Sequence, residues 1–222
     1  MRTIGVLGGM TWHSTVDYYR IINTLVRQEL GGAHSARVLV SSVDQAEIEP
    51  LMEAGRWDEA GVRLAEDAAA LERGGADVFI LACNSLHTAW EGIVAPLTIS
   101  AIHIGDATAA AIPDSVERVV LLGTRYTMEG AFLRERIEAR GVEVVVPDED
   151  DRAEVHRAIF DELSNGVVRD ETREWFTKLI ARLGAEVVVL GCGELAMLEL
   201  NGFDAVDTAR AHAEAAVAFA LH

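Results

Sequence analysis

The chain has 222 residues, a formal net charge of −17 and 50% hydrophobic residues. This length fits one large domain or two small ones, and the apolar content is ample for a core. The acidic charge argues against a nucleic-acid or anionic-membrane partner, because binding to phosphate requires a basic surface. Because the sequence has neither a run of about 18 apolar residues nor a charged-then-apolar leader, we expect a cytoplasmic protein.

Strands and helices alternate along the first half with short connections, which is the pattern of parallel βαβ units. Glycine pairs end the first strand and the first helix, and Pro96 stops the helix after the third strand. We expect strands at 3–7, 37–43, 78–82 and within 97–104, and helices at 14–30, 57–73, 85–94 and 107–111.

The second half repeats this organisation, beginning with a strand that ends in Gly123-Thr124. Thr124 and Thr127 have the spacing of an N-cap turn, and Asp207-Thr208 that of a cap for the last helix. We expect strands at 118–122, 142–146 and 187–190, an acidic loop at 148–151, and helices at 128–140, 152–163, 171–183 and 209–221.

These patterns predict an α/β fold of two pseudo-symmetric domains, each a mostly parallel sheet flanked by helices. We expect residues 1–102 and 207–222 to form the first domain, closed by the C-terminal helix, and residues 103–206 to form the second. The sequence shows no low-complexity linker between them.

The two cysteines occupy matching places in the two halves. The stretch DVFILACNS, which contains Cys83, resembles EVVVLGCGE, which contains Cys192. Ligands of open parallel sheets bind beyond the carboxyl ends of the strands, so two facing halves would bring both thiols into one cleft. Thiols on opposite faces of a substrate carbon suggest proton removal on one side and proton delivery on the other. Without a secretion signal, two thiols are expected rather than a disulfide.

A single cysteine at a strand end is usually a small buried apolar residue, but two equivalent cysteines favour a function. Each lies where a strand gives way to a helix, and the positive end of a helix dipole stabilises a thiolate. Backbone amides near Asn84, Ser85, Gly193 and Glu194 can bind a carboxylate or an enolate, although such residues are equally common as plain helix starts. Gly8-Gly9 lacks the spacing of a dinucleotide-binding fingerprint.

His87 follows Cys83 by four residues, on the same helical face. Together with Cys192 and Glu194 these residues have the chemistry of a zinc set, but the paired spacing of a structural zinc site is missing. We interpret His87 as a polar group that orients the active-site turn, with simple packing as an equal alternative, and expect no metal. Structural roles are expected for His34, His103, His156 and His212.

Five segments resemble, in order and spacing, the aspartate/glutamate racemase family, whose members invert amino acids without pyridoxal phosphate: IGVLGGMTWHSTVDYYRIIN, LGGAHSARVLVSSVDQAEIE, LLGTRYTMEGAF, GCGEL and VDTARAHAEAAVAFAL. The resemblance implies a small amino-acid substrate, no cofactor, a homodimer, an active site between the two halves, and Cys83 and Cys192 as its catalytic residues. It places the substrate near Met10, Thr11, Gln45, Met52, Asn84, Ser85, Thr124, Thr127, Gly193 and Glu194, with His87 and Arg125 in support.

Four positions bear on the substrate. Ser85 keeps the hydroxyl of the family's usual threonine, whereas Gly193 loses it; Met52 stands where glutamine is frequent, and Ser164 lies near the lysine of strict aspartate racemases. Amino-acid racemisation is therefore better supported than an aspartate or glutamate substrate. The alternatives are a related isomerase or decarboxylase acting on a small carboxylic acid, and a catalytically silent amino-acid-binding homologue. Retention of two thiols favours racemisation.

Overall fold

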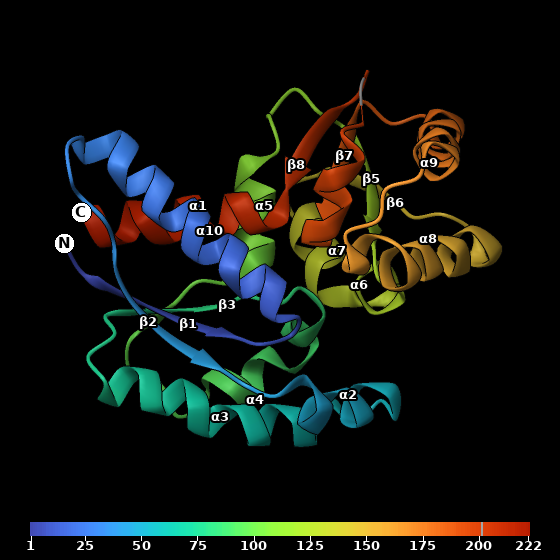
Figure 1. Cartoon of the computed structure of the whole chain (residues 1–222). Helices are drawn as coiled ribbons and strands as arrows, with labels where there is room; N and C mark the ends of the chain where they lie inside the picture. The colour runs from blue at the N-terminus through green and yellow to red at the C-terminus, as the bar shows by residue number, and fades with distance from the viewer. Residues whose placement is uncertain (201) are drawn as a thin grey trace. The chain divides into compact units, whose positions relative to one another are not determined.

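The computed structural model describes residues 1–200 and 202–222 (Figure 1). The chain forms two compact units, residues 1–104 with 212–222 and residues 105–211. Each unit holds one four-stranded sheet in which every strand pairing is parallel, with helices around it. The predicted α/β class with two parallel sheets is confirmed. The domain boundaries given above stay a prediction, because compactness alone does not show which segments fold together.

The sheet of the first unit has the strand order β2-β1-β3-β4. Its strands are β1 (Thr3–Gly8), β2 (Arg37–Ser42), β3 (Val78–Leu81) and β4 (Ser100–Ala101). Both central strands are buried along their whole length, as their continuous apolar runs predict. Helices α1 and α3 lie on opposite faces of this sheet (Figure 1). The helices are α1 (Trp12–Leu30), α2 (Gln45–Glu53), α3 (Trp57–Arg73), the 3₁₀ helix η1 (Ser85–Ala89) and α4 (Trp90–Val94).

The sheet of the second unit has the equivalent order β6-β5-β7-β8. Its strands are β5 (Arg118–Gly123), β6 (Glu143–Val145), β7 (Val187–Gly191) and β8 (Asp204–Asp207). Its helices are α6 (Arg125–Glu129), α7 (Ala131–Glu138), α8 (Glu149–Asp161), η2 (Leu163–Asn165), α9 (Asp170–Leu183) and η3 (Gly193–Leu198). Two helices, α5 (Ile104–Ala111) and α10 (Thr208–Leu221), contain the points at which the chain passes from one unit to the other.

In both units, a glycine at the end of the first strand packs closely against a threonine of the following helix. A Cβ atom on Gly8 would lie 2.2 Å from Thr15 Oγ1, and one on Gly123 would lie 3.0 Å from Thr127 Cβ. Each glycine therefore lets the following helix bring a buried threonine against the strand. This repetition supports the internal symmetry inferred from the sequence.

Two sequence expectations in the second unit are wrong. The helix expected at 128–140 is interrupted at Gly130, whose extended backbone (φ −71°, ψ 149°) separates α6 from α7. A Cβ atom there would lie 2.6 Å from the Tyr126 carbonyl oxygen, so only glycine fits this close approach. The acidic loop expected at 148–151 is instead the start of α8, where the Asp148 side chain accepts a hydrogen bond from the Asp151 N–H. Carboxylates are favourable at this end of a helix.

Three further elements differ from expectation. Helix α2 and strand β8 were not predicted; the first is only nine residues long and contains Pro50, and the second is a four-residue strand with a half-polar sequence. The single helix expected at 85–94 begins as the 3₁₀ segment η1 and continues as α4. The other expected strands and helices are present, with their ends shifted by a few residues.

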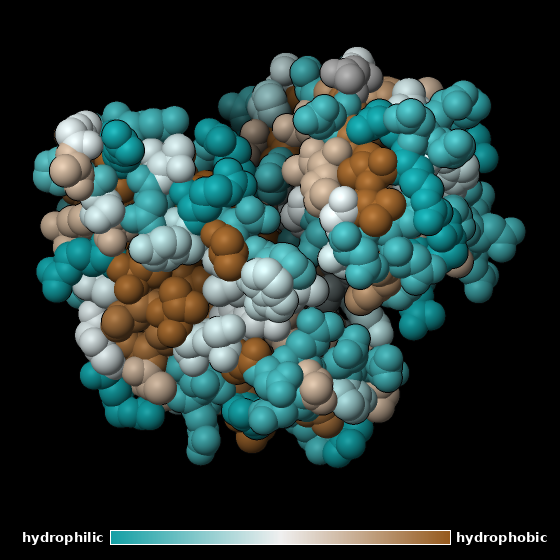
Figure 2. Space-filling view, viewed as in Figure 1, coloured by the Kyte–Doolittle hydropathy of each residue, from teal (hydrophilic) through white to brown (hydrophobic). Residues whose placement is uncertain are grey.

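The surface is largely hydrophilic, with an apolar area where α1 and β2 lie (Figure 2). Exposed apolar side chains in these elements are Trp12, Val16, Tyr19 and Leu30 of α1 and Val40 of β2. Among the helices of the described residues, none combines the length and the apolar character needed to cross a membrane.

Candidate active site

In the first unit, many of the predicted site residues follow the carboxyl ends of adjacent strands. Gly8 of β1 pairs with Ser42 of β2, and Leu7 of β1 pairs with Leu81 of β3, so these strands end side by side. The segments that come next carry Met10 and Thr11 after β1, Gln45 after β2, and Cys83, Asn84 and Ser85 after β3. The edge expected from sequence to bind ligand therefore gathers these residues in one place.

The second unit gathers its own set in the same way. Gly123 of β5 pairs with Gly191 of β7, so the turns after these strands are neighbours. The turn after β5 carries Thr124, Arg125 and Thr127, and the turn after β7 carries Cys192, Gly193 and Glu194.

The Cys83 turn is held by a buried imidazole. Cys83 is partly exposed, and neither cysteine of the chain is in a disulfide. His87 Nδ1 lies 2.8 Å from the Cys83 carbonyl oxygen, and its Nε2 accepts a hydrogen bond of 3.2 Å from the Ile104 N–H. Since Nε2 accepts, Nδ1 carries the proton and donates to Cys83. Both ring nitrogens are thereby engaged, which leaves no imidazole lone pair for a metal.

His87 is neutral in this arrangement. Burial lowers the pKa of His87 well below its ordinary value, and the nearby imidazoles of His103 and His212 lower it further. The ring is 2% exposed, so a charge on it would have almost no access to water.

The Cys192 turn differs because its polar partner contacts the thiol itself. The Cys192 Sγ donates a hydrogen bond to Glu194 Oε2 at 2.8 Å, and both residues are partly exposed. Glu194 was expected from sequence to bind substrate; the structure pairs its carboxylate with the thiol. A Cβ atom on the intervening Gly193 would have nothing within 4 Å, so this turn has room for a larger side chain.

The helix dipoles next to the two cysteines are smaller than the sequence predicts. The segments after the two cysteines, η1 and η3, are 3₁₀ helices of five and six residues. Short 3₁₀ turns align few peptide dipoles, so the individual amides of the turns are the relevant donors rather than a macrodipole.

The turn after β5 divides into a buried side and an exposed side. Thr127 has no exposed surface, and Thr124 Oγ1 lies 3.3 Å from its hydroxyl oxygen. Arg125 is exposed; its backbone N–H donates to His156 Nδ1 at 3.1 Å, and its guanidinium lies 5.7 Å from the centre of the Tyr126 ring. Burial, followed by the positive charge of Arg125, lowers the pKa of His156, which suits an accepting nitrogen.

Four other residues singled out from the sequence can be placed within their own units. Met10 and Met52 are each 8% exposed, so both side chains are largely packed. The Gln45 amide donates to Glu49 Oε1 at 3.4 Å, and Ser164 lies partly exposed in η2. Sequence reasoning gave no role to Thr15, which accepts a hydrogen bond from the Gly9 N–H, although its place after a glycine turn matches that of Thr127.

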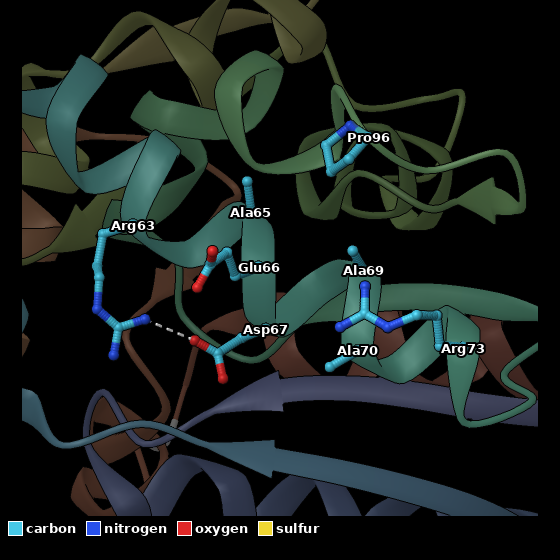
Figure 3. A pocket seen from close by; sticks show the side chains of 8 residues that line it. All are labelled: Arg63, Ala65, Glu66, Asp67, Ala69, Ala70, Arg73 and Pro96. Carbon is cyan, nitrogen blue, oxygen red and sulfur yellow. Dashed lines mark hydrogen bonds and ion pairs between the residues drawn. The ribbon is translucent and has the colours of Figure 1, made fainter.

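A groove with a volume of about 580 Å³ lies along α3 (Figure 3). The residues that line it are not part of the turns described above. Arg63 and Asp67 form an ion pair on its wall at 2.9 Å. Among the described residues, its lining contains none of the predicted site residues: it consists of Arg63, Ala65, Glu66, Asp67, Ala69, Ala70, Arg73 and Pro96. We assign no part of the site to it.

Comparison with known proteins identifies the family. Residues 7–216 match the family model described as Asp/Glu/Hydantoin racemase. A crystal structure assigned to the Asp/Glu racemases from Yersinia pestis has a TM-score of 0.92 and 39% identity, and PH1733, an aspartate racemase homologue from Pyrococcus horikoshii, has a TM-score of 0.87 and 30% identity; in each case 100% of both chains is covered.

A curated relative is the broad specificity amino-acid racemase RacX of Bacillus subtilis. It is 32% identical over 91 residues, which are 41% of this chain and 40% of the relative. The family match spans both sheets and both cysteine turns. The chain therefore belongs to the Asp/Glu/Hydantoin racemase family.

Proposed function

We propose that the protein is an amino-acid racemase that needs no pyridoxal phosphate and uses Cys83 and Cys192 as its two proton carriers. One observation carries this proposal: β3 and β7 are the equivalent strands of two sheets with the same order, and each is followed by a cysteine that precedes a short 3₁₀ helix. Inversion at a carbon needs one proton acceptor and one proton donor. The duplicated turns supply one thiol for each.

In the proposed reaction, one cysteine acts as a thiolate and removes the proton from the substrate Cα, leaving the bonding electrons on the carbon. The other cysteine acts as a thiol and transfers its proton to the opposite face of that carbon. The two sulfurs exchange protonation states in each turnover, so the reverse direction uses the same groups with their roles exchanged. The choice of base follows from the enantiomer bound.

Proton transfer by two thiols needs assistance at the substrate carboxylate. General acid–base catalysis contributes about 10²- to 10⁴-fold, which is too little for the weakly acidic Cα–H of an amino acid. Hydrogen-bond donors that stabilise the enolate-like carboxylate supply the remainder. We propose the backbone amides near Asn84, Ser85, Thr124 and Gly193 for this role, because they follow the carboxyl ends of β3, β5 and β7.

Glu194 extends the chemistry of Cys192. Its Oε2 accepts a hydrogen bond from the Cys192 thiol, with 2.8 Å between Sγ and Oε2. The carboxylate is therefore placed to take this proton when Cys192 must act as the base. When Cys192 must act as the donor, its proton leaves the hydrogen bond to Glu194 and passes from the sulfur to the substrate carbon, and the sulfur becomes a thiolate. We therefore assign Glu194 to proton exchange with Cys192 rather than to substrate binding alone.

The proposed substrates are several amino acids rather than aspartate or glutamate alone. Gly193 provides no hydroxyl, Met52 no amide and Ser164 no ammonium group, so three donors for a side-chain carboxylate are missing relative to strict family members. Each missing hydrogen bond to a charged group costs roughly 1.5–3 kcal/mol, or about ten- to a hundredfold in selectivity. The broad specificity in the name of the Bacillus subtilis relative agrees with this. Arg125 could supply a compensating donor.

An incubation with a panel of L- and D-amino acids in deuterium oxide tests the proposal, with NMR to follow deuterium at Cα and a chiral assay to follow inversion. A racemase incorporates solvent deuterium as it forms the opposite enantiomer. An amino acid that binds without exchange at Cα would indicate a silent binding protein, and release of carbon dioxide would indicate a decarboxylase. Either result would overturn the proposal.

A further inference from the structure

Three histidines of the first unit lie together beside the Cys83 turn, although they come from distant parts of the sequence. The ring centroid of His87 lies 4.6 Å from that of His103 and 5.8 Å from that of His212. The ring of Trp90 stacks on His87 at 5.1 Å. All three histidines are at most 4% exposed, so this is a polar cluster inside the unit.

Hydrogen bonds fix the protonation of two of these rings. Tyr18 has a hydroxyl 2.9 Å from His212 Nδ1, and His212 Nε2 lies 2.8 Å from the Ile102 carbonyl oxygen. A carbonyl only accepts, so His212 carries its proton on Nε2, and its Nδ1 accepts from Tyr18. His87 has the opposite tautomer, with the proton on Nδ1. Both rings are therefore neutral and oriented.

The hydrogen bonds of His87 and His212 also lie where the chain leaves the first unit and where it returns. The segment Ile102–Ile104 is bound from two sides, by His212 at the Ile102 carbonyl and by His87 at the Ile104 N–H. Ile104 is the last residue of the unit before the chain leaves it, and His212 is the first residue after the chain returns. The remaining bond of His87 goes to the Cys83 carbonyl.

We propose that His87 is a positioning residue for Cys83: the bond from its Nδ1–H to the Cys83 carbonyl holds the cysteine turn in place, and the bond from the Ile104 N–H to Nε2 fixes the ring tautomer that supplies this donor. This inference rests on the proposed role of Cys83 as a proton carrier. A thiol must lie within about 3.5 Å of the Cα proton and in line with it, and small displacements of a reacting group cost large factors in rate. Loss of the bond should therefore lower kcat with little effect on KM.

Two amide substitutions separate the two bonds of the ring. In His87→Asn the amide nitrogen takes the place of Nδ1 and can still donate to Cys83, but nothing accepts from Ile104. In His87→Gln the amide oxygen takes the place of Nε2 and can still accept from Ile104, but the donor to Cys83 is lost. Tyr18→Phe is the matched control, because it removes a buried hydrogen bond of the same cluster without touching the Cys83 turn.

We expect His87→Gln to lose kcat by roughly thirty- to a hundredfold with KM nearly unchanged, and His87→Asn to stay within about threefold of the wild type. Tyr18→Phe should melt at a lower temperature and keep its kcat. Equal losses in the two His87 variants, or a loss in Tyr18→Phe as large as in His87→Gln, would overturn the proposal. If the wild-type protein does not exchange Cα protons at all, the proposed function fails instead.

The ring tautomers give a test that does not depend on the variants folding. Two-bond ¹H–¹⁵N correlation spectra of histidine-labelled wild-type protein distinguish Nδ1–H from Nε2–H. We expect the Nδ1–H form for His87 and the Nε2–H form for His212 at neutral pH. The Nε2–H form at His87 would exclude the bond to Cys83, and a protonated ring would exclude the bond from the Ile104 N–H; either result would contradict the inference.

Discussion

The turns after β3 and β7 come from equivalent places in two similar sheets, yet their cysteines are supported in different ways. The Cys83 turn is held through its backbone carbonyl by the buried, neutral His87. In the Cys192 turn the thiol itself is engaged, because its Sγ donates a hydrogen bond to Glu194. The first hydrogen bond engages the backbone of a cysteine, and the second engages the thiol itself.

This difference shows that internal symmetry of the fold does not require symmetry of the chemistry. A two-base racemase needs two proton carriers, but nothing requires them to be tuned by the same group. The backbone repeats because both units use one strand order, whereas the side chains around each thiol are set by separate neighbours. Experiments that treat the two turns separately are therefore the most informative.

The largest effect is expected from removing either thiol. Cys83→Ala and Cys192→Ala should each abolish racemisation, because inversion needs a proton carrier on each face; we expect losses in kcat of about 10⁴-fold or more. Elimination from a β-chloro amino acid needs only the abstracting base, so each variant should retain it for one enantiomer, and the two variants for opposite enantiomers. Chiral chromatography and a keto-acid assay measure both reactions, and circular dichroism checks the fold.

Racemisation at the wild-type rate in either single variant would show that its cysteine is not a proton carrier. If both variants retained elimination for the same enantiomer, the two cysteines would not be the bases for opposite enantiomers.

A smaller loss is expected from Glu194→Gln, which keeps an acceptor for the thiol but cannot take its proton. We expect kcat/KM to fall roughly ten- to a hundredfold, within the range of general base catalysis. The fall must be the same for both enantiomers, since the equilibrium constant of racemisation fixes their ratio. Elimination should fall only for the enantiomer on which Cys192 is the base. Glu186→Gln, at the opposite end of β7, is the control and should have no effect. Equal losses in elimination for both enantiomers would argue against a specific link to Cys192.

Restoring a hydroxyl in the Cys192 turn should change specificity more than rate. Gly193→Thr fits without a clash, because a Cβ atom there has nothing within 4 Å. The ratio of kcat/KM for aspartate or glutamate to that for neutral amino acids should rise about tenfold, as expected for one hydrogen bond to a charged group. Gly193→Val has the same shape without the hydroxyl and should not raise the ratio. If the two variants behave alike, the hydroxyl is irrelevant; exclusive activity of the wild type on acidic substrates would contradict the specificity proposal itself.

The last effect is one of stability rather than activity, and it should come from the histidines of the first unit. Burial lowers the pKa of His212 to about 4, and also lowers that of His87, so both are neutral when folded. Between about pH 4 and 6.5 the unfolded chain binds more protons than the folded one, so stability should fall as the pH falls, by up to about 1.4 kcal/mol per pH unit for each histidine. Urea unfolding at several pH values measures this slope.

His212→Gln keeps a donor for the Ile102 carbonyl and cannot titrate, so it should reduce the slope. An unchanged slope in this variant would mean that other groups cause the acid sensitivity.

Much of the fold could be predicted because its signals are local. Continuous apolar runs indicate the strands, and helical patterns between them indicate most helices, with glycines marking many of the ends. The same patterns place both cysteines in turns at strand ends. The errors were local too: Gly130 interrupts a helix through a contact with the Tyr126 carbonyl, and Asp148 begins a helix where charge suggested a loop. Short elements such as β8 carry too few residues for a periodic signal.

By itself, the sequence determined the class of fold, the repetition of its halves and the resemblance to a racemase family, because these depend on residue order and spacing. Only the tertiary structure decided which polar groups meet. His212 reaches the carbonyl of a residue 110 positions away, and His87 binds both Cys83 and Ile104. Which of many possible donors and acceptors pair inside a core is settled by the packing of the whole unit, since a buried polar group must find a partner among whatever neighbours the fold provides.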